Sequence, residues 1–65
     1  MRWKRSSPIL HELINDKGEL LAEIKVGWFC DVKTKNRRGG WNYASAGNVR
    51  SAKAKAKRML AEEAM

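Results

Sequence analysis

The chain has 65 residues, a formal net charge of +7 and a sequence pI of about 10.1. A chain of this length forms one domain around one hydrophobic core, and its stability is marginal without a disulfide or a metal ion. Cys30 is the only cysteine, so no internal disulfide can form, and this favours a reducing compartment over secretion.

Residues 1–8 predict a basic N-terminal arm, followed by a single sheet-plus-helix domain over residues 9–65. Residues 8–14 are open to two interpretations. Their apolar residues are spaced as in a helix, but so short a segment forms a poor helix in isolation. A strand would instead lead into the turn Asn15-Asp16-Lys17-Gly18 and would pair with the strand that follows. We favour the strand.

A period of two runs from residue 20 to residue 32 and predicts strands with one buried face. The buried side would hold Ile24, Trp28 and Cys30, and Phe29 would face the other way. The run is long for one strand, and Gly27 interrupts it, so we expect either two strands or one strongly bent strand.

The last third of the chain predicts a loop, a short strand and a helix. Residues 35–40 are rich in turn-forming residues, and residues 41–44 read as a short aromatic strand. Residues 49–64 contain neither proline nor glycine and are rich in alanine, with Asn48 as a suitable N-cap. The expected fold class is α+β, with a three- or four-stranded antiparallel meander packed against one C-terminal helix.

Neither a secretory signal nor a membrane span is expected. The basic N-terminal residues are followed by Ser6-Ser7-Pro8 rather than by an apolar segment. The longest mostly apolar stretch, residues 26–32, is too short to cross a bilayer. We therefore expect a cytoplasmic protein with no membrane partner.

The sequence offers no catalytic or metal-binding constellation. His11 is the only histidine, Cys30 is expected to be buried, and neither has a partner at the spacing of a metal site. The carboxylates are scattered, and so small a chain seldom encloses a pocket. We expect a protein that is not an enzyme and that has no cofactor, metal ion or small-molecule substrate.

The basic residues of the expected helix lie where helix stability alone would not place them. Positive side chains occupy its N-terminal half, whereas Glu62 and Glu63 lie at its C-terminal end, against the helix dipole. A positive helix start is a good seat for phosphates, and the alternative is a solvated face that tolerates the mismatch. Together with a basic hairpin loop, the helix supplies the candidate nucleic-acid contacts: Arg37, Arg38, Arg50, Lys53, Lys57 and Arg58.

Two aromatic residues are candidates for stacking or for an interface. If Phe29 and Trp41 lie on the open face of the sheet, they can stack on bases or anchor a partner. The alternative is that they cover a small apolar cluster near Trp3.

The order of elements over residues 18–63 resembles small domains made of a three-stranded sheet and a C-terminal helix. The likeness rests on Gly18-Glu19-Leu20-Leu21-Ala22-Glu23-Ile24-Lys25, the aromatic strand and the alanine-rich helix. The arm-type DNA-binding domain of phage integrases and the plant ethylene-response DNA-binding domain are examples, and this resemblance implies a sheet that enters the major groove. The stretch Lys53-Ala54-Lys55-Ala56-Lys57 is similar to the last helix of double-stranded-RNA-binding domains, which implies lysines on phosphates. The basic segment with Trp3, ahead of a compact sheet and helix, is similar to short phage-encoded proteins.

The leading hypothesis is a non-catalytic protein that binds DNA or RNA through its phosphates, as a monomer or a dimer. The competing hypothesis is a small phage-encoded interaction factor that docks on an acidic host protein through exposed aromatic residues.

Overall fold

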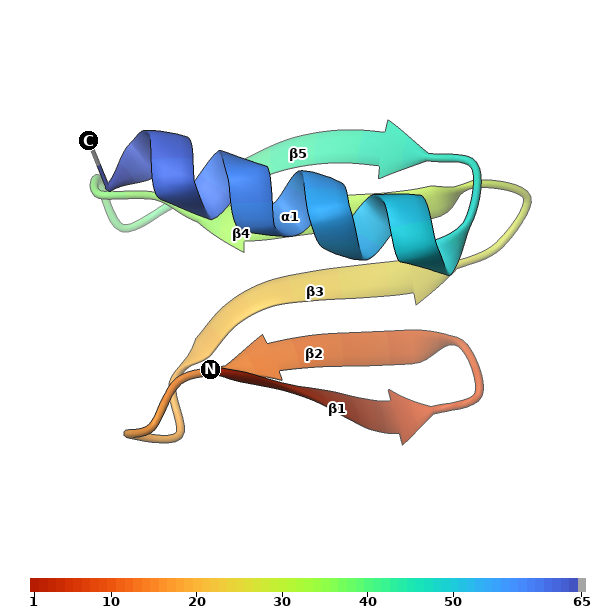
Figure 1. The fold of residues 1–65 in the computed structure, drawn as a ribbon, viewed down its shortest axis with the longest axis horizontal. Helices are drawn as coiled ribbons and strands as arrows, with labels where there is room; N and C mark the ends of the chain where they lie inside the picture. Colours follow the sequence, from red (N-terminus) through yellow and green to blue (C-terminus); the bar gives the residue numbers. More distant parts are fainter. Residues whose placement is uncertain (65) are drawn as a thin grey trace.

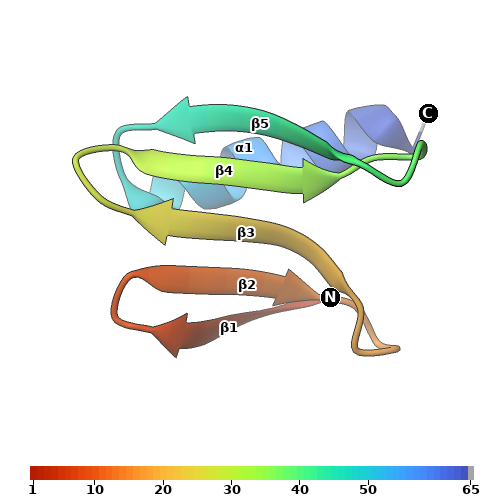
Figure 2. The same ribbon diagram turned by 180° about the vertical axis from the view of Figure 1, so that it is seen from behind.

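The computed structural model describes residues 1–64, which form five strands and one helix (Figure 1). In chain order these are β1 (Arg2–Ser7), β2 (Leu10–Ile14), β3 (Leu20–Val26), β4 (Cys30–Lys35), β5 (Trp41–Ala46) and α1 (Val49–Glu63). The strands form one antiparallel sheet in the order β1-β2-β3-β4-β5, and α1 lies across one face of it (Figures 1 and 2). The expected α+β class with a C-terminal helix is confirmed. The sheet has five strands, however, and not the three or four that we expected.

The additional strand comes from the segment that we expected to be a basic arm. β1 pairs with β2 along its length, with Trp3 opposite Leu13 and Arg5 opposite His11. Trp3 is the only apolar residue of β1, so the strand carries almost no hydrophobic alternation. The strand favoured for residues 8–14 is confirmed as β2.

The run from residue 20 to residue 32 is divided into two strands by a turn at Gly27-Trp28-Phe29. The amide of Gly27 donates to the carbonyl oxygen of Phe29 at 3.0 Å, and Val26 and Cys30 pair across the turn. Trp28 is fully exposed at the tip, so the expectation that it joins the core is wrong. The alternation gave a wrong prediction for Trp28 because it continues through the turn. Val26 and Cys30 face the same side of the sheet, and Trp28, which lies midway between them in the sequence, fits the same alternation without being part of a strand.

The core lies between α1 and the three strands it covers, β3, β4 and β5, and it extends to Leu13 of β2. Ala52 and Ala56 on α1 have no exposed surface, and their small side chains let the helix lie close to Ile24 and Val32. Cys30 is buried in the same cluster, as expected. Among residues 1–64, the buried apolar residues are Leu13, Ala22, Ile24, Cys30, Val32, Ala52 and Ala56.

The helix leaves part of its own side of the sheet uncovered. Among the described residues α1 packs against β3, β4 and β5, while β1 and β2 lie beside it rather than beneath it (Figures 1 and 2). Trp3, Arg5 and His11 lie on the same face of the sheet as α1. Trp3 is paired with Leu13 of that face, and Arg5 is paired with His11, which is itself paired with Ile24. We call these three residues, with the face they occupy, the β1–β2 shelf.

Candidate nucleic-acid interface

The start of α1 is capped as predicted and is free of acidic side chains. The side chain of Asn48 accepts a hydrogen bond from the amide of Ser51 at 2.8 Å. The first turn of α1 contains no acidic residue and the last turn no basic one. Because the dipole favours the opposite arrangement, helix stability does not account for these charges.

Five cations lie on the solvent side and flanks of α1: Arg50, Lys53, Lys55, Lys57 and Arg58. Lys55 donates to the carbonyl oxygen of Ser45 at 2.8 Å, and Arg58 lies 3.9 Å from the Glu62 carboxylate. This ion pair is exposed, so it holds the Arg58 side chain only weakly. The exposed side of α1 is therefore a strongly positive surface.

Lys53 leans away from the helix toward the β1–β2 shelf. Its Nζ lies 5.4 Å from the centre of the Trp3 ring, in a cation–π contact. Burial is the main cause that lowers the pKa of His11, and the positive charges of Lys53 and then Arg5 lower it further. The structure thus places Lys53 of α1 near the second cation, Arg5, on the β1–β2 shelf.

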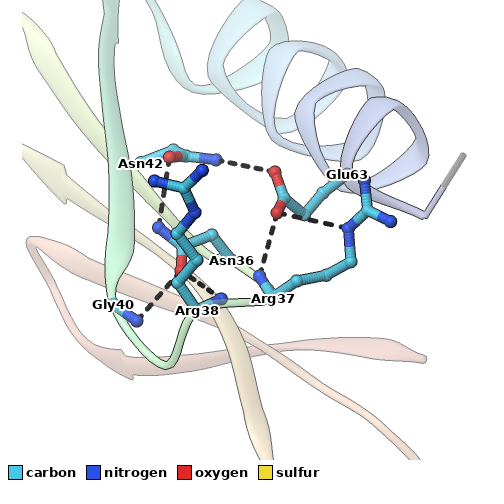
Figure 3. Close-up of polar contacts among 6 residues, drawn as sticks. All are labelled: Asn36, Arg37, Arg38, Gly40, Asn42 and Glu63. Atoms are coloured by element: carbon cyan, nitrogen blue, oxygen red, sulfur yellow. Dashed lines mark hydrogen bonds and ion pairs between the residues drawn. The ribbon is translucent and has the colours of Figure 1, made fainter.

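The basic loop lies at the other end of α1 and is tied to it (Figure 3). The carboxylate of Glu63 accepts from the amide of Arg37 at 2.9 Å and lies 3.6 Å from the Arg37 guanidinium nitrogen Nε. It also accepts from Asn42 at 3.3 Å, while the side chain of Asn36 accepts from the amides of Arg38 and Gly40. Arg37 and Arg38 are therefore held near the C-terminal end of α1, roughly 20 Å along the helix axis from Arg50.

This clamp predicts a dependence of stability on pH. The hydrogen bond from the Arg37 amide is the main cause that lowers the pKa of Glu63 below its ordinary value of 4.5. A lowered folded-state pKa stabilises the fold at pH values above the ordinary value, and that stabilisation is lost as pH falls through the folded-state value. In thermal unfolding, Glu63→Gln should lower the midpoint at pH 7, and the difference from the parent protein should shrink in acid. Glu62→Gln, one residue away and without this clamp, is the control and should change the midpoint less.

The open face of the sheet, on the side away from α1, carries mixed charge. Lys33 lies 4.7 Å from the centre of the Trp41 ring and 3.9 Å from the Glu23 carboxylate. Lys25 lies opposite Asp31 in the register of β3 and β4. Trp41 is half-buried on this face, on the other side of the sheet from Trp3, so the two do not form the common cluster that we considered.

Phe29 lies in the β3–β4 turn beside Trp28 and not on the open face of the sheet, where we expected it. Phe29 is 67% exposed and Trp28 is 100% exposed. We call these two residues the aromatic tip. Sequence analysis missed Trp28 because its parity matched the buried residues of both strands.

Sequence analysis also missed Arg5 and His11. The structure brings Lys53 together with these two residues, whereas it places Arg37 and Arg38 at the far end of α1. Their only signal in the sequence would have been the pairing of β1 with β2.

Over residues 1–64, no group of three or more histidine, cysteine or acidic residues is placed to hold a metal ion. No helix in this part of the chain is long and apolar enough to span a membrane. Comparison with protein-family models, with curated proteins and with solved structures gave no match.

Proposed function

We propose that this protein binds nucleic acid without catalysing a reaction, and that it holds the phosphates with the exposed side of α1. The observation that carries the proposal is the gathering of five cations on one short helix whose first turn has no acidic residue. This arrangement opposes the helix dipole, so it needs a reason other than folding, and a polyanion supplies one.

The cations are spaced to follow a phosphate backbone. Arg50 and Arg58 are separated by about 12 Å along the helix axis, which corresponds to about three and a half phosphate spacings of one strand at about 3.4 Å each. Lys53 and Lys57 lie one turn apart between them. Arg37 and Arg38 add positive charge beyond the C-terminal end, where a longer ligand would reach them.

The open face of the sheet is the less suitable surface. Glu23 and Asp31 stand among its lysines, and Lys33 already interacts with both Glu23 and Trp41. A sheet that entered the major groove would bring these carboxylates close to phosphates. We therefore assign the phosphate contacts to the helix side.

The test is fluorescence anisotropy of labelled duplex DNA, single-stranded DNA and duplex RNA, each titrated at two salt concentrations. Binding that weakens steeply with salt supports the proposal, because cations on phosphates release counterions. The best-bound ligand then identifies the nucleic-acid class. Absence of binding to all three at low salt contradicts the proposal.

The aromatic tip supports a second candidate function, docking on an acidic host protein. Trp28 and Phe29 expose large apolar surface at a turn that does not need it for folding, and such side chains are typical anchors of protein interfaces. Absence of salt-dependent binding to all three nucleic acids would favour this candidate. The cations of α1 would then contact an acidic patch of the partner protein.

A further inference from the structure

We propose that the β1–β2 shelf and Lys53 form a seat for one phosphate group, bound between Arg5, His11 and Lys53. This inference rests on the proposed function and adds a specific site to it, beside the exposed side of α1, with Lys53 shared by the two. The chemical group recognised is a phosphate of the nucleic-acid backbone.

The three side chains come from three elements and converge on one uncovered area. Arg5 of β1 is the cross-strand partner of His11 of β2, and both share the helix side of the sheet with Trp3. Lys53 reaches that area from α1, since its Nζ lies over the Trp3 ring at 5.4 Å. Because α1 packs on β3, β4 and β5 among the described residues, no backbone element covers the shelf.

No carboxylate of the neighbouring elements balances this charge. Glu12 is the only acidic residue of β1 and β2; it pairs with Lys4 in the register and accepts from Ser6, on the opposite face. The acidic residues of α1, Glu62 and Glu63, lie at its C-terminal end. Among residues 1–64, neither Arg5 nor Lys53 forms an ion pair.

The groups that face His11 make it a sensor of an anion at this seat. Arg5 faces it from β1, Lys53 from α1, and the uncharged Ile24 is its partner on β3. Burial and then these two cations lower the pKa of the free imidazole. A phosphate placed among the three groups acts in the opposite direction, so it raises the pKa of His11, and affinity should increase as pH falls.

The first experiment follows the imidazole resonance of His11 by NMR during pH titrations. His11 is the only histidine, so its signal needs no assignment by mutation. The titrations are made without ligand, with the oligonucleotide that binds best in the anisotropy assay, and with inorganic phosphate. We expect the oligonucleotide to raise the pKa of His11. We also expect affinity to rise about three- to tenfold between about pH 8 and about pH 5.5 in the parent protein, and to stay level in His11→Gln.

The second experiment compares two neighbouring residues of β1 that face opposite sides of the sheet. Arg5→Gln should weaken oligonucleotide binding about three- to tenfold, whereas Lys4→Gln, which removes the same charge from the other face, should weaken it less than about twofold. Circular dichroism of both variants checks that the fold is kept.

The outcomes separate this inference from the proposed function. Oligonucleotide binding with an unchanged pKa of His11, or equal losses in Arg5→Gln and Lys4→Gln, overturns the phosphate seat and leaves the function standing. Absence of oligonucleotide binding overturns the function, and an effect of inorganic phosphate on His11 would then show a seat for a free phosphate instead.

Discussion

The double variant Lys53→Glu, Lys57→Glu is expected to lower nucleic-acid affinity by more than about tenfold at moderate salt. It should also reduce the slope of log affinity against log salt by about 1.8, because two phosphate contacts are removed and each contributes about 0.9 for duplex DNA. Both residues lie in the middle of α1, where a bound strand would contact them whichever way it runs. Anisotropy titrations at four or more salt concentrations give the slope directly.

A matched double reversal separates a local contact from a general effect of net charge. Lys17→Glu, Lys25→Glu changes the net charge by the same amount, but both lysines are exposed and lie away from α1, in the β2–β3 turn and on the open face of the sheet. We expect this control to change the slope by less than about half as much. Equal slopes in the two variants would contradict the assignment of phosphate contacts to α1. Unfolding curves should show that the Lys53→Glu, Lys57→Glu variant still folds, since glutamate is a good helix former and neither position belongs to the buried stripe of α1.

The helix could be predicted from the sequence because every signal for it is local. Alanine content, the cap residue Asn48 and the stripe that contains Ala52 and Ala56 all lie within one segment, and the structure confirms the cap and the buried stripe. The strand structure on either side of Gly27 was also predicted, as two strands or one strongly bent strand, because the alternation is nearly uninterrupted; the structure has two strands.

What the sequence did not reveal depends on which segments pair. β1 has a polar sequence, and it is a strand because it lies in register with β2, whose Leu13 reaches the core. The contact of Lys53 with Trp3 requires that pairing and also the packing of α1 on β3. This contact joins residues fifty positions apart, and no local pattern encodes such a distance. For the same reason Trp28 was misplaced, since parity along the chain does not identify where a strand ends.

Ile24→Ala is expected to cause the largest loss of stability of any single truncation in the sheet, about 2–5 kcal/mol. The Ile24 side chain has no exposed surface and lies in the cluster that contains Ala52 and Ala56. A domain of this size has a total stability of roughly 3–10 kcal/mol. The substitution therefore removes a large share of it, and in a weakly stable background much of the protein will be unfolded. Urea denaturation followed by circular dichroism measures the change as a shift in midpoint.

Ile9→Ala is the matched control, because it makes the same truncation at a site that does not support the core. Ile9 lies between β1 and β2 and is 50% exposed, and its carbonyl oxygen, which accepts from the Val26 amide at 2.7 Å, is kept in the variant. We expect a loss below about 1 kcal/mol, in proportion to the smaller apolar area removed from water. Equal losses of unfolding free energy in the two variants would mean that α1 does not pack tightly on β3 and β4. The surface formed by α1 and the β1–β2 shelf would then lack the rigid base that a phosphate site requires.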